Sequence, residues 1–125
     1  MATYADLHIH SYYSDGTMSP AMIARQAAAL GVGLVAVADH NMLEGSRRLA
    51  VYCRKEGIRC LPAVELDTLE DGRLQHILGY GIDLDDRQFI EFCQRNRLML
   101  DRRNEILVER MARDIPGVSV EDYHR

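Results

Sequence analysis

Three short apolar runs separated by two helical segments constrain this chain more than any other feature. The runs cover residues 6–10, 32–38 and 58–64, and the segments between them have apolar residues at helical spacing. A repeat of strand, helix and strand in units of about 25 residues predicts parallel strands joined by right-handed crossovers. The expected fold class is therefore α/β, with a parallel sheet or barrel.

Both helical segments have recognisable ends. Ser19 and Pro20 are typical of a first helical turn, and Gly31 is a typical stop signal. The second helix is expected from about Leu43 to Glu56, with Gly57 ending it. The residues expected to be buried are Met22, Ile23, Ala27 and Leu30 in the first helix, and Leu49, Val51, Tyr52 and Cys53 in the second.

The connection after the third run is too short for another parallel crossover, which needs a dozen or more residues. A hairpin with a two-residue turn at Asp71-Gly72 is expected instead. That turn pairs Asp67 with His76 and Glu65 with Leu78, so Glu65, Asp67 and His76 share one face. A slip of one residue would remove this arrangement.

The last third of the chain is expected to be helical. Residues 85–114 form either one long helix or two helices with a break near Asp101, and residues 118–125 begin a further helix. The candidate buried positions are Phe89, Ile90, Phe92, Cys93, Leu100, Ile106, Leu107, Val108 and Met111. The arginines of this region, Arg95, Arg97, Arg102, Arg103, Arg110 and Arg113, either form a solvated face or supply one or two side chains that reach a substrate phosphate.

Four of the five histidines lie at or beside the ends of the apolar runs, each accompanied by carboxylates. Ligands gather at the carboxyl ends of parallel strands, and imidazole with carboxylate is a usual donor set for a catalytic metal ion. The sequence therefore indicates part of a hydrolytic metal site. Its candidate residues are His8, His10, Asp15, His40, Glu65 and His76.

Each candidate also has a simpler explanation. Asp39 could cap the next helix and leave His40 on the surface, and His76 could be only a cross-strand partner of Asp67. Asp6 shares the expected face of His8 and His10, where its carboxylate would fix an imidazole tautomer. Three further residues are open as ligands, as groups that support ligands, or as neither: Asp39, Asn41 and Asp67. His124 is expected to be an exposed side chain.

Composition excludes several functional classes. The net charge of −4 argues against broad adhesion to nucleic acid or anionic membranes. The three cysteines form no CxxC motif, so reduced and mostly buried thiols are expected. There is no charged leader and no run of about 18 apolar residues, which predicts a soluble, cytoplasmic protein. Motifs of phosphate-binding loops, of dinucleotide-binding folds and of serine hydrolases are missing.

Four segments of the chain, in order, resemble the N-terminal motifs of the PHP (polymerase and histidinol phosphatase) family of metal-dependent phosphoesterases. They are Asp6-Leu7-His8-Ile9-His10-Ser11 with Ser14-Asp15-Gly16, then Ala38-Asp39-His40-Asn41, Pro62-Ala63-Val64-Glu65, and His76-Ile77-Leu78-Gly79-Tyr80. The resemblance implies a distorted seven-stranded β/α barrel, similar to a TIM barrel, with two or three divalent ions of zinc, manganese or iron at its carboxyl face.

The same resemblance implies roles for the residues. His8 and His10 would bind one ion, Glu65 would bridge to a second ion with His76, and Asp15 and His40 would hold a third. Asp15 and His40 would then act in catalysis through a metal-bound hydroxide that attacks phosphorus. The expected substrate is a small phosphomonoester, a nucleotide or an oligonucleotide end, without stable nucleic-acid binding.

Members of this family are usually about twice as long as the 125 residues here, and their later motifs complete the metal site. The resemblance therefore implies one PHP domain over residues 1–125, as the N-terminal half of the barrel. Self-association is expected, because an open sheet leaves unpaired edges and apolar surface. Two alternatives remain: a metal-binding or assembly module without turnover of its own, and an amidohydrolase-type enzyme, because those enzymes also use His-x-His on a first strand.

Overall fold

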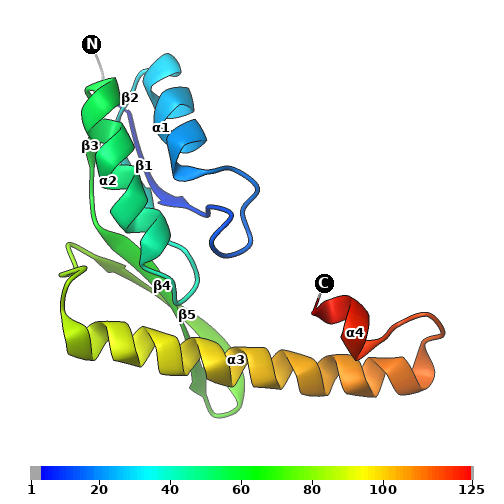
Figure 1. Cartoon of the computed structure of the whole chain (residues 1–125). Helices are drawn as coiled ribbons and strands as arrows, with labels where there is room; N and C mark the ends of the chain where they lie inside the picture. The colour runs from blue at the N-terminus through cyan, green and yellow to red at the C-terminus, as the bar shows by residue number, and fades with distance from the viewer. Residues whose placement is uncertain (1–3, 125) are drawn as a thin grey trace.

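The computed structural model describes residues 4–124, and the order of elements confirms the α/β class (Figure 1). The helices and strands are, in order, β1 (Tyr4–Ile9), α1 (Pro20–Ala29), β2 (Val32–Val37), α2 (Glu44–Glu56), β3 (Arg59–Cys60), β4 (Ala63–Glu70), β5 (Arg73–Tyr80), α3 (Arg87–Asp114) and α4 (Val120–Tyr123). Within the described residues the strands form two sheets and no closed barrel.

The first sheet is parallel, with strand order β1-β2-β3, and the second is the antiparallel hairpin β4-β5. A single parallel bridge between His40 and Glu65 joins the end of β2 to β4. It is supported by the hydrogen bond from the Asn41 amide to the Glu65 carbonyl, at 2.8 Å. This bridge places residues that follow β2 directly beside β4.

The prediction of one continuous strand over residues 58–64 is wrong. The residues paired with β2 are Arg59 and Cys60, the Leu61 amide donates a last hydrogen bond to the Val35 carbonyl at 2.9 Å, and a new strand begins at Ala63. Pro62 lies at the break and has no amide hydrogen, so it cannot continue a ladder of hydrogen bonds. β4 is therefore free to leave the parallel sheet and pair with β5.

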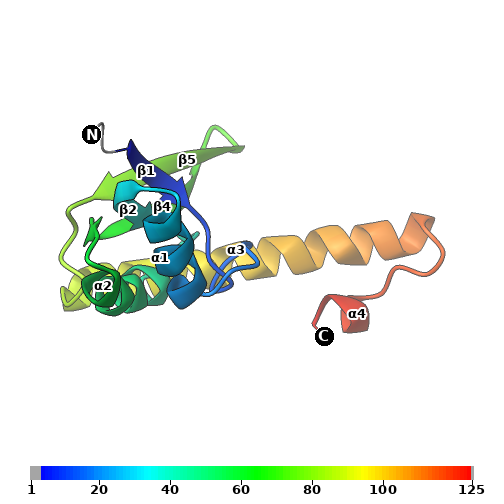
Figure 2. The same cartoon turned by 90° about the horizontal axis from the view of Figure 1, so that it is seen from above.

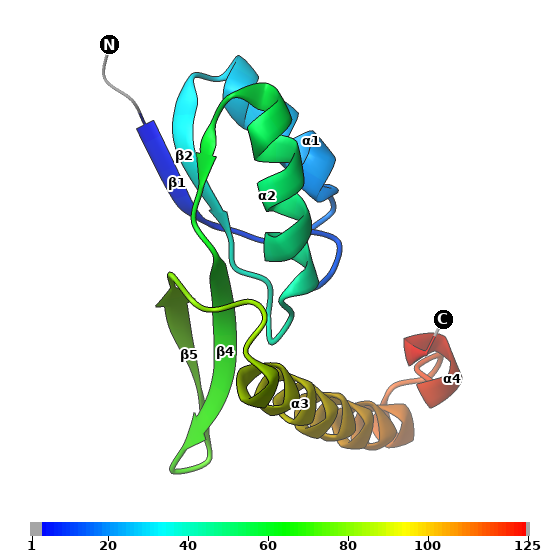
Figure 3. The same ribbon diagram turned by 60° about the vertical axis from the view of Figure 1, so that its left-hand side comes forward.

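Helices α1 and α2 lie side by side on one face of the parallel sheet (Figure 3). Alternate residues of β2 point to opposite faces, as a strand requires. Val35 and Val37 pack under the two helices, whereas Ala36 and Ala38 pack against Ala63 on the other face. The helix-covered core consists of Ile23, Ala24, Ala27, Val35, Val37, Leu49 and Cys53.

The boundaries of these helices agree with the expectation from sequence. The Ser19 hydroxyl accepts a hydrogen bond from the Met22 amide at 3.2 Å, which caps α1, and Gly57 ends α2 in the left-handed conformation at φ 71°. Three of the expected core residues are instead exposed, namely Met22 (50%), Leu30 (69%) and Val51 (42%). Ile23, Ala24 and Ala27 form the buried face of α1, and Met22 and Leu30 lie outside that face.

The hairpin has the predicted register throughout. Glu70 pairs with Arg73, Asp67 with His76, and Glu65 with Leu78. Asp71 and Gly72 both have positive φ, at 49° and 76°, which a tight two-residue hairpin turn requires.

Helix α3 is a single helix of 28 residues, so there is no break near Asp101. Its second half extends away from the rest of the molecule, and α4 lies beside that far end (Figure 2). Among the nine positions expected to be buried in this region only Cys93 is, and Phe92, Leu107 and Met111 are at least 41% exposed. The spacing of apolar residues predicted the helix correctly. It could not show that few other segments of the described chain pack against the second half of α3.

No helix of the described chain is long and apolar enough to span a membrane.

Candidate metal centre

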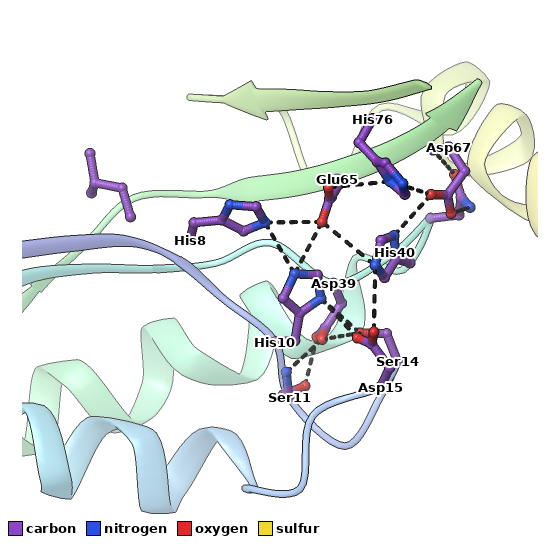
Figure 4. Close-up of polar contacts among 12 residues, drawn as sticks. His8, His10, Ser11, Ser14, Asp15, Asp39, His40, Glu65, Asp67 and His76 are labelled. Atoms are coloured by element: carbon purple, nitrogen blue, oxygen red, sulfur yellow. Dashed lines mark hydrogen bonds and ion pairs between the residues drawn. The ribbon is translucent and has the colours of Figure 1, made fainter. Parts of the chain in front are cut away.

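Side chains from β1, the loop after it, the end of β2, β4 and β5 converge at one edge of the molecule (Figure 4). The structure brings together every residue that the sequence singled out as a candidate ligand. They fall into three overlapping groups whose donor atoms lie within 4.8 Å of one another: His8, His10 and Glu65; His10, Asp15 and His40; and His40, Asp67 and His76.

Glu65 is at the centre of the first group. Its Oε2 lies 3.0 Å from the Nε2 atoms of both His8 and His10, and those two nitrogens are 3.1 Å apart. His40 Nε2 is 3.6 Å from the same oxygen, and His76 Nδ1 is 3.3 Å from Oε1. One buried carboxylate therefore contacts all four imidazoles.

The surroundings of Glu65 affect its ionisation in opposite directions. Burial raises the pKa of the carboxyl group, but the hydrogen bond with His8 and the nearby imidazoles of His40 and His10 outweigh burial and hold the pKa below its ordinary value. Glu65 is consequently kept as a carboxylate, the form that binds a cation.

The loop after β1 supplies the second group. Asp15 Oδ1 lies 3.0 Å from His10 Nδ1, and Asp15 Oδ2 lies 3.6 Å from His40 Nε2. Asp15 is 68% exposed in its side chain, whereas His10 and His40 are mostly covered. Asp15 is thus an open carboxylate at the solvent side of the cluster.

The third group differs from the expected pairing. Asp67 Oδ1 lies between two imidazoles, 3.0 Å from His40 Nδ1 and 2.8 Å from His76 Nδ1. Asp67 therefore contacts the imidazoles at distances as short as those of Glu65. The sequence alone did not decide whether Asp67 is a ligand, a group that supports ligands, or neither. The cross-strand contact of Asp67 and His76 exists as well, because the hairpin register places them opposite each other.

The donor atoms have the spacing that a shared ion would impose. Two ligand atoms that are each about 2.1 Å from one ion, at a tetrahedral angle, lie about 3.4 Å apart. The measured separations of 3.0 to 3.6 Å around Glu65 Oε2 bracket that value. The donors are imidazole nitrogen and carboxylate oxygen, which suit zinc, manganese or iron, so the residues fit the metal that the sequence implied.

Asp39 has a different role. It is fully buried and accepts hydrogen bonds from the Ser11 amide at 2.7 Å, the Ser11 hydroxyl at 2.6 Å and the Ser14 hydroxyl at 2.7 Å. These contacts fix the loop that carries Asp15, and Asp39 is absent from all three donor groups.

Two glycines make room for this loop, and their role was not evident from the sequence. A Cβ atom on Gly45 would lie 1.9 Å from Asp39 Oδ2, and one on Gly16 would lie 2.0 Å from the His10 carbonyl oxygen. Gly16 belongs to the Ser14-Asp15-Gly16 motif, and its tight packing shows why glycine is required there. Gly45, in the first turn of α2, gave no signal.

Asn41 connects the centre to helix α3. It adopts positive φ, 51°, and its side-chain amide donates to Asp67 Oδ2 at 2.7 Å, while its Oδ1 accepts from the Asp67 amide at 3.2 Å. Asn96 of α3 donates to Asn41 Oδ1 and to the Asp67 carbonyl, both at 2.5 Å. Asn41 is therefore a supporting residue, and Asn96 is one that the sequence did not indicate.

Asp6 was expected to hydrogen-bond to an imidazole ring and fix its tautomer, but its hydrogen bond has a different partner. Its carboxylate accepts from the backbone amide of His8 at 3.4 Å, not from an imidazole ring. The pairing of β1 with β2 is irregular between Asp6 and Ile9, and as a result Leu7 and Ile9 pack into different clusters. The simple alternation expected over residues 6–10 is therefore wrong.

His124 is 54% exposed, as expected, and pairs with Glu105 at 3.1 Å.

A cavity of about 350 Å³ opens beside the centre. One side is formed by residues of the cluster, including Asp15, His40, Asp67 and His76. The other side is formed by α3, which contributes Arg97, Leu100, Asp101, Arg103 and Asn104. The volume is within the range of small-molecule sites, so a ligand larger than a phosphate ion can be accommodated.

The imidazoles and carboxylates thus gather beside the carboxyl ends of β1 and β2 and on the adjoining hairpin of an α/β fold. In a comparison with protein families, the model of the PHP domain matches residues 6–114, and the chain therefore belongs to the PHP family.

Two similar proteins are considerably longer than this chain. The chain is 32% identical over 98 residues to a 5′-3′ exoribonuclease of Haemophilus influenzae, covering 78% of this chain and 36% of that protein. It is 37% identical over 78 residues to a 3′,5′-nucleoside bisphosphate phosphatase of Chromobacterium violaceum, covering 62% of this chain and 27% of that protein. The chain thus spans between about a quarter and just over a third of the length of these relatives.

Solved structures support the same fold. A protein of Bifidobacterium adolescentis described as a metal-dependent phosphoesterase superposes with a TM-score of 0.81 at 28% identity, over 93% of this chain and 41% of that one. An amidohydrolase from Chromobacterium violaceum, with bound sulfate, gives a TM-score of 0.77 at 30% identity, over 92% and 41%. The fold of this chain therefore matches part of each neighbour.

Proposed function

We propose that the protein is a metal-dependent phosphoesterase that hydrolyses a phosphate ester of a small organic molecule, a nucleotide or an oligonucleotide end. The observation that carries this proposal is the contact of one buried carboxylate, Glu65, with four imidazoles at the edge of the sheet. Membership of the PHP family and the names of the relatives support it.

The proposed ligands are His8, His10, Asp15, His40, Glu65 and His76, with Asp67 added because it contacts two of the imidazoles. Two or three divalent ions of zinc, manganese or iron held by these residues would supply positive charge for the phosphoryl oxygens and activate water for attack. In this proposal Glu65 and the imidazoles around it would hold the ions, and Asp15 is the exposed carboxylate on the solvent side of the cluster.

The chain's own residues have distinct tasks in this mechanism. Asp39 holds the loop of Ser11 and Ser14 so that Asp15 faces His10 and His40. Asn41 and Asn96 hold Asp67 in place. Because such supporting hydrogen bonds orient ligands, their loss usually lowers metal affinity by about 10- to 100-fold.

We further propose that residues 4–124 correspond to the first part of a PHP barrel. The parallel strands β1, β2 and β3 with two covering helices, followed by the bridge from His40 to β4, support this interpretation. The superposition on about two fifths of each larger neighbour supports it as well.

Phosphate release tests the proposed function. The purified protein, loaded separately with manganese, iron or zinc, is incubated with phosphomonoesters, nucleotides and short 5′-phosphorylated oligonucleotides. We expect metal-dependent release of phosphate or nucleotide that is lost in His10→Ala and kept in His124→Ala, since His124 lies outside the cluster. Metal binding without turnover on any ester would instead favour a metal-binding module, and cleavage of amides alone would favour an amidohydrolase.

A further inference from the structure

Tyr80 ends the last of the four motifs, and the proposed function gives it no role. Because alternate residues of a strand share a face, Tyr80 lies on the same side of β5 as His76. Its hydroxyl donates a hydrogen bond to the backbone carbonyl of Leu7 in β1, at 2.9 Å. Within the described residues this is the one hydrogen bond that joins the backbone of β1 to the hairpin.

The hydrogen bond from Tyr80 reaches β1 where its pairing with β2 is irregular. The register shifts between Asp6 and Ile9, which leaves one extra residue in β1. An extra residue of this kind is a bulge, and a bulge can re-aim a side chain. The irregular segment contains Leu7 and His8, so its conformation determines where the His8 imidazole points.

The His8 imidazole has little else to hold it. Its Nε2 lies 3.0 Å from Glu65 Oε2 and 3.1 Å from His10 Nε2, and no hydrogen bond or ion pair found within residues 4–124 uses its Nδ1. A ligating imidazole usually donates its second N–H to a partner that fixes the ring. The ring of His10 has such a partner, because Asp15 lies 3.0 Å from its Nδ1. The position of the His8 ring therefore depends on the backbone of β1.

We propose that Tyr80 is a positioning residue of the metal centre, whose hydroxyl fixes the bulge of β1 against the hairpin and so holds the His8 imidazole at Glu65. This inference rests on the metal centre of the proposed function. Without the hydroxyl, the bulge loses its hydrogen bond to the hairpin, and the backbone no longer fixes the distance between His8 and Glu65. Tyr80 thus acts on metal binding through His8.

Zinc affinity tests this role, measured by competition with a chromophoric chelator. Zinc binds more tightly than manganese, so its affinity stays measurable after a ligand is lost. Tyr80→Phe removes only the hydroxyl. Tyr4→Phe is the matched control, because it removes from the exposed start of β1 a hydroxyl that has no hydrogen-bond partner within residues 4–124. We expect Tyr80→Phe to weaken zinc binding by about three- to tenfold, the net effect of one hydrogen bond, and Tyr4→Phe by less than about twofold.

A double-mutant cycle separates the positioning of His8 from a general structural role. In a His8→Ala background the hydroxyl has no ligand to position, so Tyr80→Phe should change the remaining zinc affinity by less than about twofold. In an Asp15→Asn background, which weakens a different donor group, Tyr80→Phe should keep its effect of about three- to tenfold. A structural role alone would lower the affinity by the same factor in both backgrounds.

The outcomes distinguish the role of Tyr80 from the function on which it rests. Normal zinc binding by Tyr80→Phe, or an equal loss in both backgrounds, would overturn the positioning role and leave the phosphoesterase proposal intact. The expected coupling between Tyr80 and His8, without hydrolysis of any ester, would overturn the proposed reaction and leave the positioning role intact. Absence of metal binding by the unaltered protein would overturn both.

Discussion

At the scale of single residues, Glu65 is the side chain on which most contacts of the centre depend. Its two oxygens lie within 3.6 Å of nitrogen atoms from all four clustered histidines. A neutral amide at this position keeps the size of the side chain but removes the charge and one acceptor oxygen.

Glu65→Gln is therefore expected to lower affinity for manganese by at least about 100-fold, more than the loss of a supporting residue. Glu44→Gln is the matched control. Glu44 lies outside the cluster and forms an ion pair with Arg48, with an N···O distance of 2.5 Å. Isothermal titration calorimetry with manganese measures the affinity of both variants. Equal affinity of the Glu65 variant and the control would contradict the assignment of Glu65 as a ligand.

The lowered pKa of Glu65 predicts a pH effect on stability in metal-free protein. A carboxyl group whose pKa is lower in the folded state stabilises the fold at a pH above its unfolded pKa, and this contribution is lost as pH falls through the folded pKa. Glu65→Gln should lack this contribution at every pH. As pH falls, the unaltered protein should lose it, and the difference in unfolding free energy between the two proteins should shrink. Urea unfolding at a series of pH values from 7 to about 3 tests this, and a constant difference would contradict it.

The cysteines should differ in reactivity because they differ in burial. Burial, with a smaller contribution from Cys60, raises the pKa of Cys53 to about 12, and burial also raises the pKa of Cys93. A raised pKa leaves little thiolate, which is the reactive form. We expect iodoacetamide at pH 8 to modify the partly exposed Cys60 first, and mass spectrometry of peptides identifies the order. Modification of Cys53 before Cys60 in the folded protein would contradict the structure.

At the scale of elements, the first turn of α2 supports the loop that carries Asp15. Gly45→Ala would place a methyl group 1.9 Å from Asp39 Oδ2, so the helix or the loop must move. Overpacking of this kind costs about 1–3 kcal/mol of unfolding free energy. Urea unfolding should show that loss for Gly45→Ala and a smaller one for Val51→Ala, which shortens a 42% exposed side chain of the same helix.

The elements also differ in how far the sequence determined them. The hairpin register followed from Asp71-Gly72 alone, because a two-residue turn fixes every pair behind it. That register correctly predicted that Glu65, Asp67 and His76 lie on one face of the hairpin. The break at Pro62 and the exposed second half of α3 could not be derived, since both depend on which segments pack together in space. The same is true of Gly45 and Asn96, whose roles exist only through distant contacts with Asp39 and Asp67.

At the scale of the whole molecule, apolar surface and strand edges are exposed together. Within the described residues β5 pairs only with β4, and β1 only with β2, so the outer edge of each sheet is unpaired. Ile77 of β5 is 54% exposed and Leu69 of β4 is 56% exposed. Exposed edges with apolar side chains favour pairing with another chain.

We therefore expect this chain to self-associate through the hairpin. Light scattering over a range of concentrations should give a mass above that of a 14.2 kDa monomer, increasing with concentration. Ile77→Lys should shift the chain toward monomer, because a charged residue beside an open strand edge opposes pairing. Leu98→Lys is the control, since Leu98 is 69% exposed on α3, away from the hairpin edge, and should leave the mass unchanged. A monodisperse monomer at every concentration would contradict this expectation, and equal effects of the two substitutions would place the contact elsewhere.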